Sequence, residues 1–148
     1  GDHILDTGGG IQNMFKETKE NDVIVFNPDT IWNSSYRDEI LRMEKLYFSK
    51  KIENILLLVN KKLSFDKKLK GDFNLENNLI YKEEEKEFIY IGCQIINKKL
   101  LARSKIEKFS IVEIWNNLLD HKKLYGYESH NNFYHLTDLD IFNKLKDL

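Results

Sequence analysis

Cysteine and proline are almost missing from this chain of 148 residues. Cys93 is the only cysteine, which excludes an internal disulfide and a metal site built from several cysteines. Pro28 is the only proline, and no stretch rich in proline, serine or glycine divides the chain. We therefore expect one domain over residues 1–148, a length that suits a single hydrophobic core.

Two further absences restrict the partners and the compartment. The 23 basic and 24 acidic residues nearly cancel, so no overall charge attracts nucleic acid or an anionic membrane. No apolar run approaches the roughly 18 residues of a membrane span, and the N-terminus lacks a signal-peptide pattern. We expect a cytoplasmic protein without nucleic-acid or membrane partners. The chain begins with Gly1 rather than Met, so processing or truncation remains an open alternative.

Long β-branched and apolar runs are present, and they alternate with helical patterns. The runs at 22–27 and 52–60 lack a polar alternation, which is typical of strands buried on both faces of a parallel sheet. Between them, Ser35 and Asp38 resemble a helix capping box. The order predicts a βαβ unit, and hence an α/β fold with a mixed, mostly parallel sheet.

The second half of the chain has shorter elements. Asn77 and Asn78 lie at the turn of an expected hairpin, and a long apolar strand is expected at 88–96. Ser110 and Glu113 form a capping box before an amphipathic helix. Further candidate strands lie in "KLYGYE" and "FYHL", followed by a short helix at the C-terminus.

Three consecutive glycines, Gly8–Gly10, precede a helical pattern near the N-terminus. Such a loop can bring backbone N–H groups close to a nucleotide. The glycines match neither a P-loop nor the G-x-G-x-x-G fingerprint. A flexible terminal turn is the alternative, and composition alone favours it.

Asp29 lies just past the carboxyl end of the first buried strand, two residues after Asn27. Ligands of open α/β sheets bind in the crevice at the carboxyl ends of the strands. A carboxylate there commonly holds Mg²⁺ against a phosphate, because Mg²⁺ takes oxygen ligands. The alternative is an Asx turn that stops the strand.

The remaining polar groups give weaker signals. The four histidines, His3, His121, His130 and His135, lack the spacing of a zinc site, and Cys93 in an apolar strand is expected to be an inert thiol. A local group of lysines lacks interleaved aromatic residues, which favours a solvated loop over a nucleic-acid site. These lysines are Lys61, Lys62, Lys67, Lys68 and Lys70.

Six segments together resemble the sugar-1-phosphate nucleotidyltransferases, also called nucleoside-diphosphate-sugar pyrophosphorylases. The resemblance is strongest to the bacterial branch that includes N-acetylmuramate α-1-phosphate uridylyltransferase. The segments follow the family's order along nearly the whole chain. They are "LDTGGGIQN", "VFNPDTIW", "KGDFNL", "YIGCQII", "FSIVEIWNNLL" and "LYGYESHNNFYHLTDLDIF".

The resemblance implies a Rossmann-like fold and a reaction that transfers a nucleoside monophosphate to a sugar 1-phosphate with release of pyrophosphate. The implied donor is UTP, which supplies UMP, and the implied cofactor is Mg²⁺. Residues 1–62 would form the nucleotide and metal side, and residues 63–148 the sugar side. The implied nucleotide-binding residues are Thr7, Gly8, Gly9, Gly10 and Asp29, and the implied sugar-side residues are Gly71, Asp72, Gly92 and Gln94. Asp29 would also hold the metal, with His135 at the position of the family's second metal ligand.

The departures from the family are equally specific. The family's glycine-rich signature with its arginine and its Pro-Lys pair do not occur, so the catalytic residues stay unknown. We expect a nucleotidyltransferase chain without its N-terminal βαβ portion, poorly active or inactive by itself. An exposed sheet edge would favour a homo-oligomer. A non-catalytic nucleotide- or sugar-binding module and a structural subunit remain alternatives.

Overall fold

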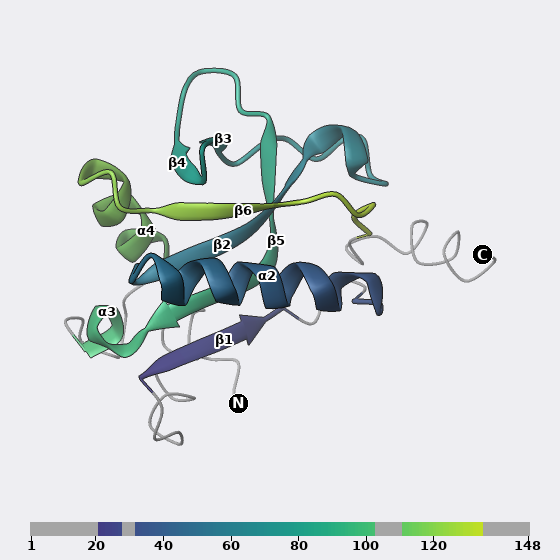
Figure 1. Ribbon diagram of the computed structural model, residues 1–148. Coiled ribbons are helices and arrows are strands. Elements are labelled where there is room, and N and C mark those ends of the chain that lie inside the picture. The colour runs from purple at the N-terminus through teal and green to yellow at the C-terminus, as the bar shows by residue number, and fades with distance from the viewer. Residues whose placement is uncertain (1–20, 28–31, 103–110, 135–148) are drawn as a thin grey trace, which may run out of the picture.

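The computed structural model describes residues 21–27, 32–102 and 111–134. Within these residues one sheet carries helices on both faces (Figure 1). Its strands are β1 (Asp22–Phe26), β2 (Asn54–Asn60), β3 (Asn74–Glu76), β4 (Leu79–Tyr81), β5 (Phe88–Asn97) and β6 (Tyr125–Ser129). The helices are α2 (Ser35–Ser49), α3 (Lys98–Ala102) and α4 (Ile111–Asp120), with a 3₁₀ turn, η1, at Lys61–Leu63.

The strand order is β1-β5-β2-β6-β4-β3, and the predicted mixed α/β fold is confirmed. Strands β1, β2 and β6 run in one direction, and β2 pairs with β6 in parallel. The long strand β5 runs in the opposite direction between β1 and β2 and pairs with both. The described sheet therefore has fewer parallel pairs than the sequence led us to expect, because β5 separates the two strands of the βαβ unit.

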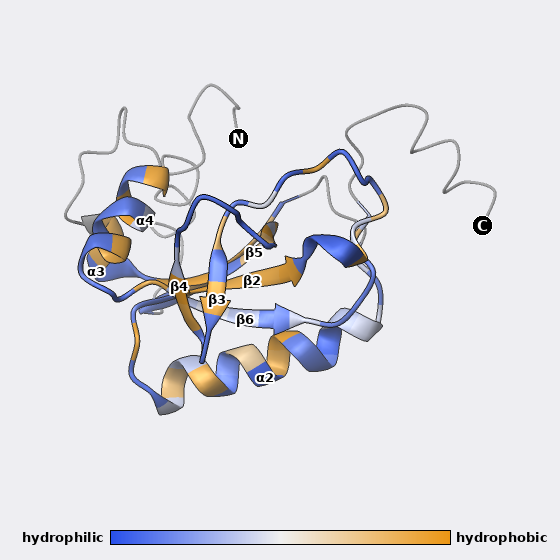
Figure 2. Ribbon diagram, turned by 90° about the horizontal axis from the view of Figure 1, so that it is seen from above, coloured by the Kyte–Doolittle hydropathy of each residue, from blue (hydrophilic) through white to orange (hydrophobic). Residues whose placement is uncertain are grey.

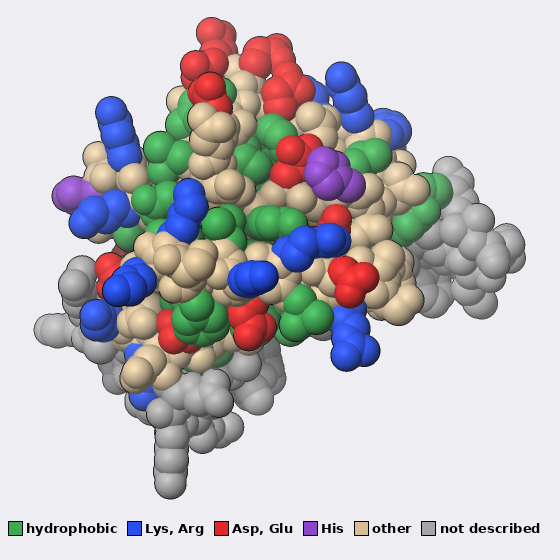
Figure 3. Space-filling view, viewed as in Figure 1, with side chains coloured by type: hydrophobic (Ala, Val, Ile, Leu, Met, Phe, Trp, Pro, Cys, Tyr) green, Lys and Arg blue, Asp and Glu red, His purple; other side chains and the backbone are tan. Residues whose placement is uncertain are grey.

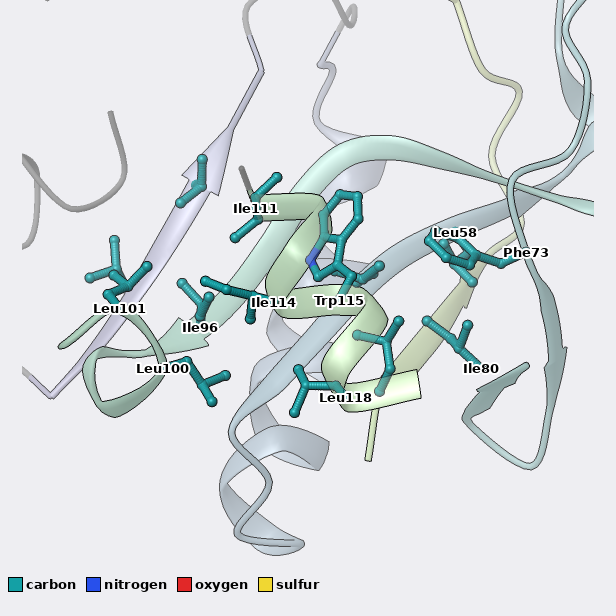
Figure 4. Close-up of a cluster of buried hydrophobic side chains, with 14 residues drawn as sticks. Leu58, Phe73, Ile80, Ile96, Leu100, Leu101, Ile111, Ile114, Trp115 and Leu118 are labelled. Carbon is teal, nitrogen blue, oxygen red and sulfur yellow. The ribbon is translucent and has the colours of Figure 1, made fainter. Parts of the chain in front are cut away.

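Helix α2 covers one face of the sheet, and α3 with α4 covers the other (Figure 2). The α2 face buries Tyr36, Met43 and Tyr47 against the apolar residues of β2 and β5. The opposite face buries Trp115 with the other apolar residues of α4 (Figure 4). Strand β2 lies between both layers, and all but its last residue are buried. This placement explains why its sequence is an unbroken apolar run.

The turn between β3 and β4 confirms the hairpin that the sequence predicted at Asn77 and Asn78. Asn77 and Asn78 have φ angles of 53° and 66°, the left-handed conformation that asparagine tolerates. The capping box expected at Ser35 is wrong: the Ser35 N–H donates to the Asn33 side chain at 2.9 Å, so Asn33 supplies this interaction. Ser34 rather than Ser35 is the N-cap residue, and its side chain makes no capping hydrogen bond.

Two other expectations have mixed outcomes. "KLYGYE" contains β6 as predicted, whereas Phe133 of "FYHL" forms only an isolated bridge with Ser64. Ser110, expected as the cap of α4, lies outside the described residues, and helix α3 was not predicted. Among the described helices, none combines the length and apolar character that a membrane span requires.

Candidate functional site

The carboxyl ends of β1, β2 and β6 lie toward the same edge of the sheet, where ligands of α/β folds bind. The end of β1 is held firmly. The backbone N–H of Asn27 donates to the Gly92 carbonyl oxygen at 2.7 Å, and the Asn27 carbonyl accepts from Trp32 Nε1 at 3.0 Å. These bonds fix the chain directly before residues 28–31, which lie outside the described part.

Gly92 is a site residue predicted from the resemblance, and the structure gives it a geometric reason. Its φ is +95°, and an added Cβ would lie 2.8 Å from the Cβ of Asn27. A side chain at this position would therefore be strained and would push the end of β1 away. The register between β2 and β5 also shifts here, between Leu56 and Leu58, so the glycine accompanies a bulge in β5.

Gly71 and Asp72 lie together beside the first half of β5. A Cβ on Gly71 would meet the Lys86 carbonyl oxygen at 2.0 Å, which leaves room only for glycine. Asp72 Oδ2 accepts from the Tyr90 N–H at 3.0 Å. Partial burial of this carboxyl raises its pKa above the ordinary value, while the Tyr90 N–H and the Lys82 ammonium act in the opposite direction. Gly71 and Asp72 thus lie beside β5, the strand that contains Gly92.

Gln94, the fourth predicted sugar-side residue, is fully buried. Its Oε1 accepts from Trp115 Nε1 at 3.2 Å and from Asn54 Nδ2 at 3.0 Å. Gln94 Nε2 and Asn54 Oδ1 have no hydrogen-bond partner among the described residues. Burial also raises the pKa of the neighbouring Tyr90 phenol. The structure therefore places Gln94 in the core beneath α4, and its predicted sugar-side role stays a prediction.

Glu39 of α2 organises the chain that follows β6, and the sequence analysis did not identify it. This carboxylate is only 6% exposed. It accepts from Ser129 Oγ at 2.6 Å, from the His130 N–H at 2.7 Å and from Asn131 Nδ2 at 2.7 Å. A buried carboxylate with three donors is well satisfied, so it fixes this loop against α2.

A cavity of about 240 Å³ opens at the carboxyl ends of the parallel pair β2 and β6. It lies between residues 62–67 and 132–134. The rings of Phe65 and Tyr134 lie with their centroids 5.5 Å apart, and backbone hydrogen bonds join Phe133 to both Leu63 and Phe65. The sequence gives only a weak signal for this cavity, because its lining consists of loop residues that follow two strands and carry no motif.

The other predicted site residues fall outside the described part. They are Thr7, Gly8, Gly9, Gly10, Asp29 and His135. Within the described ranges, no group of three or more histidine, cysteine or acidic side chains could hold a metal ion. Cys93 is fully buried, which raises its pKa to about 12 and agrees with the predicted inert thiol.

Comparison with solved structures supports the fold. HddC from Yersinia pseudotuberculosis superposes with a TM-score of 0.68 and 19% identity over 97% of this chain. A UDP-glucose pyrophosphorylase complexed with UDP-glucose gives a TM-score of 0.68 and 14% identity over 99%. UDP-glucose pyrophosphorylase from Acinetobacter baumanii gives 0.71 and 14% over 95%. No protein-family model and no curated sequence matches the chain.

The length of these neighbours adds a second fact. This chain spans 62% of HddC, 62% of the UDP-glucose complex and 54% of the Acinetobacter enzyme. At identities below 20% the likeness establishes that this chain shares its fold with HddC and with these UDP-glucose pyrophosphorylases.

Proposed function

We propose that this chain is the greater part of a sugar-1-phosphate nucleotidyltransferase, which joins a nucleoside monophosphate to a sugar 1-phosphate and releases pyrophosphate. One observation carries the proposal: nearly the whole chain shares the fold of UDP-glucose pyrophosphorylases. Six sequence segments also follow the order of that enzyme family. Uridine is the proposed base, because one of these neighbours is complexed with UDP-glucose.

The described residues would act by positioning. The Gly92 carbonyl and the Trp32 indole hold Asn27, and so hold the chain that leads to Asp29. The Glu39 carboxylate holds the loop after β6, which leads toward His135. In phosphoryl transfer, positioning and charge stabilisation supply most of the rate enhancement, so rigid strand ends suit this chemistry.

Mg²⁺ would neutralise negative charge on the phosphates of the nucleotide. Asp29 offers the oxygen ligand that Mg²⁺ prefers, and we propose it as the metal-binding residue. His135 offers an imidazole nitrogen, which suits Mg²⁺ less well than a carboxylate does. The donor set therefore fits Mg²⁺ through Asp29, with His135 as the weaker ligand. We propose the cytoplasm as the compartment of this reaction.

The experiment measures pyrophosphate release from UTP with a panel of sugar 1-phosphates, and in parallel the heat of binding of UDP-sugars to the chain. We expect binding of a UDP-sugar, and release at a low rate. Asp29→Asn should abolish release and weaken Mg²⁺-dependent UTP binding at least tenfold. Asp38→Asn, an exposed carboxylate on α2, is the matched control. Absence of both release and binding with every ligand would refute the proposal.

A non-catalytic role is the second candidate, and the exposed edge of the described sheet favours it. β1 is an edge strand of the described sheet, and Phe26 at its end is 48% exposed. An apolar edge of this kind can pair with another chain. Sedimentation at increasing concentration tests the structural version, which a monomer at every concentration would rule out. Binding of UDP-sugars without pyrophosphate release would identify the binding-module version.

A further inference from the structure

A second cleft, of about 500 Å³, lies beyond the carboxyl end of β2, and lysines dominate its lining. They come from three separate parts of the chain: Lys61 of η1, Lys67, Lys68 and Lys70 of the following turn, and Lys86 before β5. Glu84 and Glu85 also line the cleft. Among the lining residues, five lysines against two glutamates give 5 − 2 = +3, and Glu87 beside Lys61 lowers the local charge to +2, in a chain whose formal net charge is −1.

Among the described residues, most of these ammonium groups form no ion pair. Lys61 Nζ lies 4.0 Å from Glu87 Oε2, which is the one ion pair found in the described ranges. Lys67 Nζ donates to the Lys62 carbonyl oxygen at 2.6 Å, a neutral acceptor that leaves its charge uncompensated. The cleft therefore holds several like charges at close range, and an anion would relieve their repulsion.

The backbone holds the three segments side by side. Gly71 lies directly against the Lys86 carbonyl, so the chain after Lys70 and the chain before β5 are in van der Waals contact. The Lys61 N–H donates to the Glu87 carbonyl at 2.9 Å. The Lys68 N–H donates to Asp66 Oδ1 at 3.0 Å and closes the turn between them. These contacts form the cleft before any ligand binds.

We propose that this lysine-lined cleft binds a diphosphate group, either as free pyrophosphate or as part of a nucleoside diphosphate. Ammonium groups are strong point-charge partners of phosphate, and a diphosphate can contact several of them at once. The volume lies within the range of small-ligand sites. Glu84 and Glu85 disfavour a long polyanion, which would have to pass them. Acidic side chains also gather at the top of the molecule in Figure 3, with basic ones beside them.

The inference goes beyond the proposed nucleotidyl transfer. It uses neither Asp29 nor the glycine segment, and it holds whether or not the chain turns over a substrate. It also gives a role to the lysines for which the sequence indicated only a solvated loop.

Calorimetric titration of the full chain with pyrophosphate, and separately with UDP, tests the proposal. The cleft variant is Lys68→Glu with Lys70→Glu, since both residues are exposed and their side chains make no hydrogen bond in the described structure. The matched control is Arg42→Glu with Lys45→Glu, which makes the same charge change on the exposed side of α2. Circular dichroism verifies that both variants fold.

We expect one pyrophosphate site, at least tenfold weaker in the cleft variant and within twofold of the original in the control. Binding should also weaken as salt rises, because exposed charges are screened. If the binding that the cleft variant loses is tighter for UDP than for pyrophosphate, a nucleotide is the source of the diphosphate; if it is no tighter, the free anion is the ligand. Equal loss in both variants, or no binding of either ligand to the original chain, would overturn the proposal. Asp29→Asn separates the two hypotheses, because it should leave this site intact.

Discussion

The two faces of the sheet hold their helices by different means. On the α2 face, polar groups join the helix to the margins of the layer: Tyr47 donates to Asp22 Oδ1 at 2.5 Å, and Tyr36 donates to the Asn132 carbonyl at 3.0 Å. On the opposite face, α4 packs through apolar side chains over one buried amide pair, Asn54 and Gln94. Two amide atoms of that pair have no partner among the described residues.

This difference separates stability from positioning. The hydrogen bonds of α2 join it to the start of β1 and to the loop after β6, which borders the candidate site. The contacts of α4 bury apolar side chains. The amide pair beneath it, Asn54 of β2 and Gln94 of β5, keeps two atoms without a partner among the described residues. Damage to the α4 face should therefore reduce stability alone, whereas damage to α2 should also displace the edge of the site.

Trp115→Ala should have the largest effect. Trp115 is 8% exposed, and its ring lies 4.9 Å from the Tyr90 ring and 6.0 Å from the Phe73 ring. The substitution should lower the free energy of unfolding by about 4 kcal/mol, because it leaves a cavity in the apolar layer. Urea unfolding measures the loss. Asn116→Ala, exposed on the same helix, should change stability by less than about 0.5 kcal/mol.

Glu39→Ala should have the second largest effect on stability, and it tests the difference between the two faces most directly. Three donors would lose their acceptor, so we expect a loss of about 3 kcal/mol in the free energy of unfolding. Faster amide hydrogen exchange at residues 129–132 should accompany the loss, because the loop is freed from α2. Glu39→Gln keeps an acceptor oxygen and should lose less. If exchange at these residues stayed unchanged, Glu39 would not be what holds the loop.

Tyr36→Phe should act chiefly at high pH. Burial raises the Tyr36 pKa from 10.0 to about 12, with smaller contributions from Glu39 and Tyr134. The folded state thus favours the neutral phenol, so its contribution to stability is complete below pH 10 and decreases as pH rises from 10 to 12. The variant should decline less steeply in that range, and should lose about 1 kcal/mol at neutral pH with its hydrogen bond. Unfolding curves from pH 8 to 12 compare the two proteins.

Asn54→Leu should have the smallest effect. Asn54 Nδ2 donates to Gln94 Oε1 and to the Ile95 carbonyl, but its Oδ1 is buried without a partner in the described structure. Leucine removes that unpaired oxygen, and Trp115 still donates to Gln94. We expect a change within about 1 kcal/mol in either direction. A loss as large as that of Glu39→Ala would show that the hydrogen bonds of Asn54 outweigh the cost of its unpaired oxygen.

The sequence predicted the elements with strong local patterns. The unbroken apolar runs of β1, β2 and β5, the helical pattern of α2 and the Asn77-Asn78 turn all express local rules, and each was found. The position of β5 between β1 and β2 could not be read from these patterns, because pairing depends on residues 28 to 75 positions away.

The candidate site was predicted less completely. Gly92 was predicted as a sugar-side residue by resemblance, and that role stays a prediction; its close approach to Asn27 is a tertiary contact that no local pattern encodes. Glu39 was missed because a glutamate on an amphipathic helix is usually solvated, and only the fold reveals the loop that surrounds it. Gln94 was grouped with the sugar-side residues, and the structure shows that its amide faces Trp115 in the core.

The pairing of β1 with β5 has a consequence for how the chain folds during synthesis. Asp22 pairs with Asn97, so 75 residues separate the two ends of this ladder. At translation rates of about 5–20 residues per second, β1 would wait roughly 4–15 s for β5 to be made. Helix α2 and β2 are synthesised during that interval, while β5, the partner of β1 among the described strands, has yet to be made. Among the described strands, β1 is therefore made first and paired late, and its open edge is where a nascent chain would most readily associate with another.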